Sequence, residues 1–176
     1  NHNLFLKGLK KLLDNTHRKV KAFIIGDGES REGIEQMSAS LGIQFSKHTD
    51  NEHPHPLIFT SWRTDVDVIC AGLDLVALTS LNEGTPVSLI EAQAAGRAIV
   101  STRVGGIADV VLENKTALLS DIEDEDGFAN NLIKLVADDN LRNSFQEEGK
   151  NHVLAKYSYH RLVADMRKLY YELLEE

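Results

Sequence analysis

The sequence predicts an α/β domain with a parallel sheet, helices on both faces and a helical tail at the C-terminal end. Short runs rich in β-branched and aromatic residues alternate with stretches of helical apolar spacing. Strands that are separated by helices imply right-handed crossovers and therefore parallel pairing. The last third of the chain has helical spacing only. We treat residues 1–176 as one domain, because this length suits a single core.

Each element follows from its local pattern. The expected strands are Val20–Ile25, Leu57–Thr60, Leu75–Thr79, Ala98–Ser101 and Ala117–Leu119. The expected helices are a first helix around Leu4–Leu13, then Glu29–Leu41, Asp65–Gly72, Pro86–Ala95 and Gly105–Leu112, and a tail of Asp126–Ala137, Asn140–Lys156 and Tyr159–Leu174. In the last helix Leu162, Met166, Leu169, Tyr170 and Leu173 share one face, and we expect most of these residues to pack into the core.

Charge and composition exclude several function classes. The formal net charge is -8, so the surface should repel nucleic acid and anionic lipid. The single cysteine, Cys70, cannot form an internal disulfide, and we expect it to be a buried small hydrophobe. No apolar run approaches the roughly 18 residues that span a bilayer, and no signal-peptide pattern is present. A cytoplasmic location is expected.

Ligands of open parallel sheets bind beyond the carboxyl ends of the strands, so the turns that leave the strands are the candidate site. These turns are Gly26–Gly28, Ser61–Arg63, Ser80–Pro86 and Ser101–Gly106. In the third turn Thr85 suits the N-cap of the next helix and Pro86 its first position, while Gly96 suits the C′ position at its end. The free N–H groups and the dipole of this helix start predict a phosphate site.

Two carboxylates flank that phosphate site. Glu91 shares a stripe of an otherwise apolar helix with Val87 and Ile90, where burial is costly unless a partner hydrogen-bonds the carboxylate. The partner could be a ligand's hydroxyl groups, or a salt bridge to a neighbouring Arg or Lys. Glu83 precedes the helix start. A nucleotide-sugar, with hydroxyls at both ends and a diphosphate between them, would satisfy both carboxylates.

Several segments together resemble the retaining GT-B glycosyltransferases of the GT4 family. They are Glu83-Gly84-Thr85-Pro86, Glu91-Ala92-Gln93-Ala94-Ala95-Gly96, Ile99-Val100-Ser101-Thr102 and Gly105-Gly106, supported by Gly26-Asp27-Gly28-Glu29 and Trp62-Arg63. The resemblance covers nearly the whole chain and implies the Rossmann-like C-terminal half of a two-domain enzyme. That half would hold the nucleotide-sugar, and an N-terminal domain, which this chain lacks, would hold a carbohydrate or lipid-linked acceptor.

The resemblance also implies residue roles. Glu83 would contact hydroxyls of the transferred sugar and is the catalytic candidate, and Glu91 would bind the ribose. Backbone amides of Gly84, Thr85, Pro86 and Val87 would face the sugar and the distal phosphate, with Gly26 and Gly28 along the floor and the main chain near Arg63 at the base.

The same resemblance extends to cofactors and partners. The donor would be a UDP- or GDP-sugar, and the reaction would need no metal and no cofactor. Any peripheral membrane association would come through the absent domain. A cationic clamp is expected upstream of Asn1, so the 176 residues alone should not catalyse transfer.

Other interpretations stay open. The Gly26–Gly28 turn could begin a dinucleotide site, although Arg31 occupies the third glycine position. His48, His53 and His55 could hold a metal, although the polar segment 46–56 is more typical of a solvated loop. Trp62 could stack on a base or pack locally. At the level of function, the alternatives are a sugar-nucleotide epimerase of GT-B architecture and a non-catalytic nucleotide-sugar-binding module.

Overall fold

A computed structural model of the chain describes residues 1–47 and 55–174. The helices are α1 (His2–Asn15), α2 (Arg31–Ser40), α3 (Val66–Gly72), α4 (Val87–Ala94), α5 (Ile107–Val110), α6 (Glu125–Ala137), α7 (Asp139–Tyr157) and α8 (Tyr159–Leu174). The strands are β1 (Ala22–Ile24), β2 (Phe45–Ser46), β3 (Leu57–Phe59), β4 (Leu75–Leu78), β5 (Ala98–Thr102) and β6 (Ala117–Ser120). Every predicted helix and strand is present. Strand β2 was not predicted, because two residues are too short to show a period.

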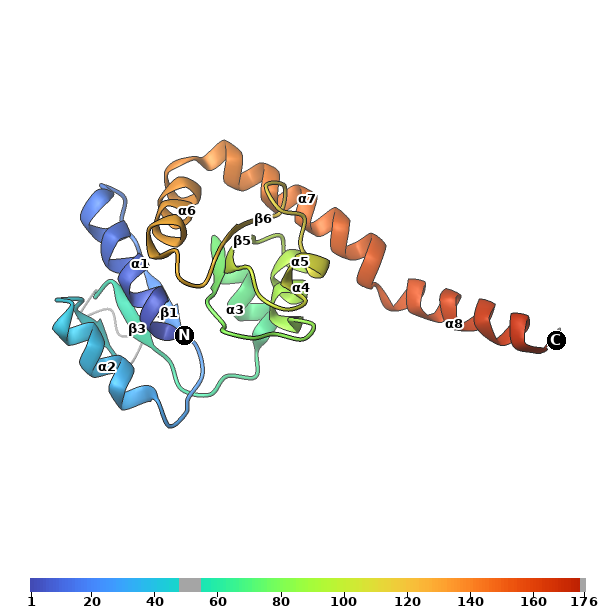
Figure 1. Cartoon of the computed structure of the whole chain (residues 1–176), viewed down its shortest axis with the longest axis horizontal. Coiled ribbons are helices and arrows are strands. Elements are labelled where there is room, and N and C mark those ends of the chain that lie inside the picture. Colours follow the sequence, from blue (N-terminus) through green and yellow to red (C-terminus); the bar gives the residue numbers. More distant parts are fainter. Residues whose placement is uncertain (48–54, 175–176) are drawn as a thin grey trace.

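The strands form two parallel three-stranded ladders in the orders β1-β3-β2 and β4-β5-β6 (Figure 1). Ala22 pairs with Leu57 in the first ladder, and Leu75 pairs with Ala98 in the second. Parallel pairing is thus confirmed. No ladder hydrogen bonds join β1 to β4 among the described strands. A cavity lined by residues of both strands lies between them.

Helices cover both faces of the second ladder, as predicted. All five residues of β5 are buried, which is typical of a central parallel strand. Ala98 and Val100 join a core cluster with side chains of α1, α6 and α7. Ile99 points to the opposite face and joins a second cluster with side chains of α4 and α5.

Helix α1 connects the two ladders. Its Leu4 belongs to the core cluster of the second ladder, whereas Leu6 and Leu9 pack with β3 and α2. Gly8 lets α1 approach α6 closely, since a Cβ there would lie 2.8 Å from Cδ1 of Phe128. The two helices lie side by side in Figure 1.

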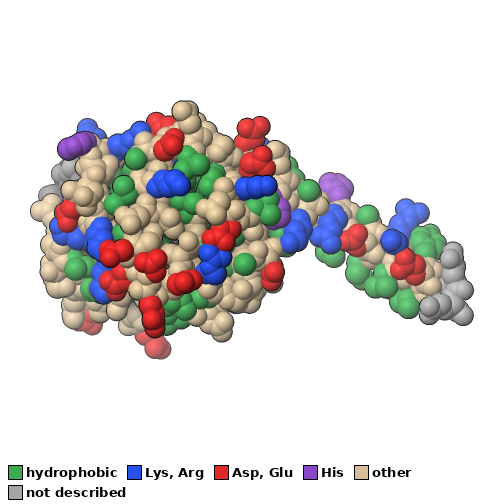
Figure 2. Space-filling model, turned by 45° about the horizontal axis from the view of Figure 1, so that its top comes forward, with side chains coloured by type: hydrophobic (Ala, Val, Ile, Leu, Met, Phe, Trp, Pro, Cys, Tyr) green, Lys and Arg blue, Asp and Glu red, His purple; other side chains and the backbone are tan. Residues whose placement is uncertain are grey.

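Helix α8 departs from the prediction that its apolar face packs into the core. It has no buried residue, and the helix projects away from the rest of the molecule (Figures 1 and 2). Its five predicted core residues are 39% to 61% exposed: Leu162, Met166, Leu169, Tyr170 and Leu173. Amphipathic spacing shows that a helix has an apolar face, but it does not place the covering surface in the same chain. No helix in the described ranges is long and apolar enough to cross a membrane.

Candidate functional site

The third and fourth predicted turns meet beyond the ends of β4 and β5. The backbone N–H of Gly106 donates to the carbonyl of Glu83 at 3.2 Å. The hydroxyl of Thr102, a fully buried residue, donates to the carbonyl of Ser80 at 2.8 Å. The end of β5 therefore fixes the path of the turn that carries Glu83.

Two glycines make this contact possible. Gly105 has a φ of +47°, and a Cβ on it would lie 1.8 Å from the carbonyl oxygen of Glu83. A Cβ on Gly106 would lie 2.1 Å from the carbonyl oxygen of Gly84. Any side chain at either position would displace the backbone of the Glu83-Gly84 segment.

The first and second turns also meet. Gly26 has a φ of +115°, and its N–H donates to the hydroxyl of Thr60 at 3.4 Å. The N–H of Gly28 is capped by the Asp27 carboxylate at 2.9 Å. The turn after β1 is thus tied to the segment that follows β3 and leads to Arg63.

A cavity of about 870 Å³ lies between β1 and β4, with residues of α1 and α3 also on its wall. Of the predicted site residues, Arg63 and Glu91 line it. Ser80 and Ser88 also line it, whereas none of the residues of the predicted segment Glu83–Val87 does. Gly26 directly follows the lining residue Ile25, whereas Gly28 belongs to a separate hollow over α2.

The start of α4 differs from the prediction by one residue. Pro86, and not Thr85, is the N-cap residue, and no side chain caps the helix. The φ of Pro86 suits a helix, but its ψ of 91° is extended. The first helical residue is therefore Val87. Gly96 has the predicted left-handed conformation, with a φ of +67°.

The missing cap leaves donors at this helix start. Within the described residues, the backbone N–H groups of Gly84, Thr85, Val87 and Ser88 make no hydrogen bond. Together with the positive end of the helix dipole, such donors favour an anion.

Glu91 is exposed, so the expectation of a carboxylate in an apolar, buried stripe is wrong. Val87 on the same stripe is 59% exposed, whereas Ile90 is half-buried against the core cluster of α4 and α5. The alternative of a salt bridge is not found either, since the Glu91 carboxylate has no hydrogen-bond or ion-pair partner in residues 1–47 and 55–174. Its oxygens are therefore available to hydroxyl groups of a ligand in the cavity.

Glu83 is half-buried and its carboxylate has a fixed partner. The Ser80 hydroxyl donates to Oε1 of Glu83 at 2.6 Å, which leaves the other carboxylate oxygen for a ligand. We did not single out Ser80 from the sequence, although its position directly after a strand and three residues before a carboxylate could have indicated it.

The remaining candidates divide between exposed and structural residues. Arg63 donates from Nε to Oδ1 of Asp65 at 2.8 Å, and this contact lowers the pKa of the Asp65 carboxyl. Trp62 is 76% exposed, so local packing does not explain it. Cys70 is buried as expected, and burial, followed by the charge of Glu91, raises the pKa of its thiol.

The histidine segment gives no metal site in the part of the chain that the structure describes. His48 and His53 lie outside the described residues. Among the described ones, no group of three His, Cys, Asp or Glu side chains could hold a metal ion.

Comparison with solved structures places this fold among glycosyltransferases. The C-terminal domain of a group 1 glycosyl transferase family protein, LpcC, from Francisella tularensis superposes with a TM-score of 0.74 at 21% identity, covering 89% of this chain and 79% of that one. HepE from Anabaena, solved in complex with UDP, gives a TM-score of 0.78 at 18% identity over 94% of this chain and 44% of its own.

Sequence relatives agree. The chain is 31% identical over 176 residues to D-inositol 3-phosphate glycosyltransferase of Corynebacterium jeikeium, covering 97% of this chain and 40% of the relative. It is 27% identical to lipopolysaccharide core biosynthesis glycosyltransferase LpsE of Rhizobium meliloti, covering 86% of this chain and 42% of the relative. The chain thus spans about two fifths of these relatives. The family model of glycosyl transferases group 1 matches residues 1–152, and the chain belongs to this family.

Proposed function

We propose that the chain is the nucleotide-sugar-binding domain of a retaining glycosyltransferase, which transfers a glycosyl group to a carbohydrate or lipid-linked acceptor. The observation that carries the proposal is the cavity between β1 and β4, with the unpartnered carboxylate of Glu91 on its wall and the uncapped start of α4 next to its lining residue Ser88. An anionic group at the helix start and a hydroxylated group at Glu91 are the two chemical features of a nucleoside diphosphate.

Each group of the site then has a definite task. The diphosphate accepts hydrogen bonds from the free N–H groups of Gly84, Thr85 and Val87, and the ribose hydroxyls donate to Glu91. Glu83, held by Ser80, lies on the opposite side of the helix start in the sequence and receives the sugar hydroxyls. We assign Glu83 to orientation of the sugar, and this is the part of the site where transfer takes place.

Stabilisation of the leaving diphosphate follows from the same geometry. Preorganised N–H groups and a helix dipole stabilise developing negative charge without reorganisation. We therefore propose a metal-independent reaction in which α4 and basic side chains neutralise the leaving group. An acceptor domain outside these residues completes the enzyme, and the free, buried thiol of Cys70 suits a cytoplasmic protein.

A nucleotide-sugar panel tests the proposal. The whole protein that contains this chain is screened by thermal shift with UDP-, GDP- and ADP-sugars, because a ligand that binds only the folded state raises its stability. Positive donors are then incubated with and without candidate acceptors. Glycosyl transfer with retained anomeric configuration supports the proposal. A changed sugar with donor alone indicates an epimerase, binding without transfer or hydrolysis indicates a binding module, and no shift with any donor refutes nucleotide-sugar binding.

A further inference from the structure

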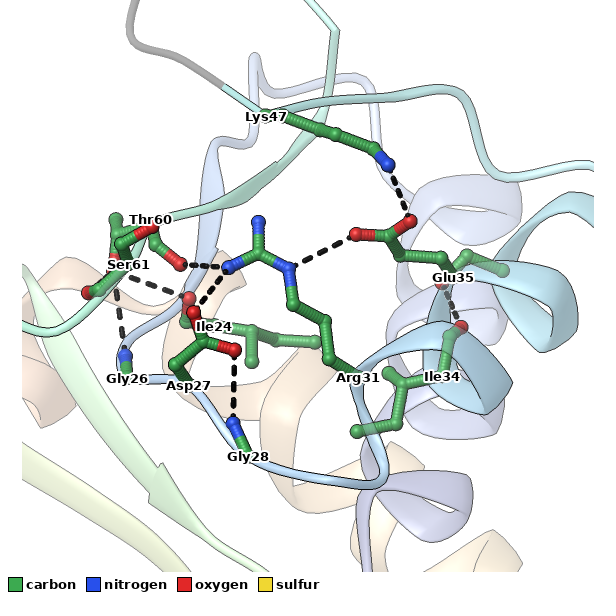
Figure 3. A network of polar contacts seen from close by, with 11 residues as sticks. Ile24, Gly26, Asp27, Gly28, Arg31, Ile34, Glu35, Lys47, Thr60 and Ser61 are labelled. Atoms are coloured by element: carbon green, nitrogen blue, oxygen red, sulfur yellow. Dashed lines mark hydrogen bonds and ion pairs between the residues drawn. The ribbon is translucent and has the colours of Figure 1, made fainter.

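Arg31, the first residue of α2, connects the two turns on one side of the cavity (Figure 3). One guanidinium nitrogen, Nη1, donates to the carbonyl oxygen of Thr60 at 2.9 Å and contacts Oδ2 of Asp27 at 3.4 Å. Its Nε donates to Oε1 of Glu35 at 3.0 Å. A single side chain therefore joins the turn after β1, the segment after β3 and helix α2.

Both acceptors outside α2 belong to segments that form the candidate site. Asp27 uses its other oxygen to cap the N–H of Gly28, and the hydroxyl of Thr60 accepts from the N–H of Gly26. These two segments carry Ile25 and Arg63 to the wall of the cavity. Movement of either segment would change the distance between those two walls.

The surroundings hold the guanidinium rigidly. The Arg31 side chain is 21% exposed and lies over the ring of Phe59, 5.8 Å from its centroid. Glu35, 13% exposed, is held from the other side by Lys47 at 2.7 Å. The two cations, Arg31 and Lys47, and the two carboxylates, Asp27 and Glu35, together carry no net charge. Arg31 therefore holds the segments together and is not a free cation for a phosphate.

We propose that Arg31 is a positioning residue of the nucleotide-sugar site, which sets the separation of the Gly26–Gly28 turn and the Thr60–Arg63 segment. The inference rests on the proposed function, because the cavity must hold a nucleotide for this separation to matter. A planar guanidinium can serve the Thr60 carbonyl, Asp27 and Glu35 at once, whereas an ammonium group on a flexible stem cannot hold the same geometry.

The loss of Arg31 would have different effects if its ion pairs only stabilised the fold than if it positioned the site. Loss of a structural pair lowers the stability of the fold and leaves the nucleotide affinity of the folded protein unchanged. Loss of a positioning residue weakens nucleotide affinity and raises the KM for the donor. The kcat should change little, because the side-chain partners of Arg31 are Asp27, Thr60 and Glu35, whereas Glu83 is held by Ser80.

Three variants separate these roles: Arg31→Gln, Arg31→Lys and, as matched control, Glu35→Gln. The control removes a charge from the same network but retains the contacts of Arg31 with Asp27 and Thr60. Calorimetry with UDP and GDP on the whole protein, together with donor kinetics, gives Kd, KM and kcat. For whichever of UDP and GDP binds the wild type more tightly, we expect the Kd to rise about tenfold in Arg31→Gln. The affinity should recover in part in Arg31→Lys, and the Kd should change less than about twofold in Glu35→Gln.

Each outcome either supports or overturns the positioning role of Arg31. A tenfold rise confined to the Arg31 variants, with a raised KM and a kcat within about threefold of wild type, supports it. Unchanged affinity in Arg31→Gln, or an equal loss in Glu35→Gln, overturns it while the proposed function stands. If the wild-type protein binds neither nucleotide and no donor of the UDP-, GDP- and ADP-sugar panel, both the proposed function and this inference are refuted.

Discussion

Replacement of Gly105 by Ala tests how the site turn is held. Gly105 has a φ of +47°, which costs an L-residue about 1–2 kcal/mol. The added Cβ would also lie 1.8 Å from the Glu83 carbonyl oxygen and 2.9 Å from its carbonyl carbon. These neighbours are backbone atoms, so a side-chain rotation cannot relieve the contact. Forced backbone shifts of this kind cost about 1–3 kcal/mol more.

The expected loss is therefore about 2–5 kcal/mol in the free energy of unfolding, measured by urea denaturation. The same displacement carries Glu83 out of place, so transfer activity should fall in the fraction that remains folded. Gly33→Ala is the matched control, because Gly33 lies inside α2, its φ is not positive and a Cβ there meets nothing within 4 Å. This control should be neutral or stabilising by up to about 1 kcal/mol. A loss below about 0.5 kcal/mol for Gly105→Ala, no larger than the usual surface substitution, would refute the argument from close approach.

Three further predictions concern individual side chains. Glu91→Ala should weaken nucleoside diphosphate binding by about 1.5–3 kcal/mol by calorimetry, the scale of a charge-assisted hydrogen bond, and an unchanged affinity would remove Glu91 from the site. Glu83→Gln should leave nucleoside diphosphate affinity nearly intact but reduce transfer from the nucleotide-sugar, and equal losses in both assays would contradict its assignment to the sugar. Lys47→Met should lower the free energy of unfolding by about 0.2–1 kcal/mol at pH 7. Because Lys47, and then Arg31, lowers the pKa of the Glu35 carboxyl, this stabilisation is present above the unfolded-state pKa of about 4.3 and disappears as the pH falls through the lower folded-state value. A difference between wild type and variant that persists at low pH would contradict the ion-pair explanation.

Local patterns carried most of the fold prediction. The buried strand β5 and the left-handed Gly96 follow from residue types that admit few alternatives, namely a continuous apolar run and a glycine after a helix. The missed strand β2 exists only through its pairing with β3, which is separated from it by the residues that the structure does not describe. Pairing between strands is a tertiary property, so a two-residue segment does not reveal it.

The arrangement of the candidate turns was predictable in part, for the same reason. The sequence indicated which turns leave the strands, and those turns do meet in pairs. It did not indicate the contacts between them, because Thr102, Ser80 and Arg31 act through partners that are distant in the sequence or on another turn. The exposure of Glu91 was missed because an apolar stripe on a short helix looks the same whether it faces a core or an open cavity.

The two carboxylates of the candidate site differ in how firmly the fold holds them. Glu83 is fixed, because Ser80 holds its carboxylate and Gly106 holds its carbonyl. Glu91 has no such partner in the described chain and stands exposed on α4 at the cavity wall. A fixed group favours a single orientation of the sugar at the reacting centre, where displacement by about 1 Å is costly to catalysis. An unfixed group retains its hydration until a ligand replaces the water, so under the proposed function we expect Glu91 to contribute affinity without setting the geometry of transfer. Under the proposed function, orientation of the sugar and binding of the nucleotide would be divided between two carboxylates within nine consecutive residues, 83–91.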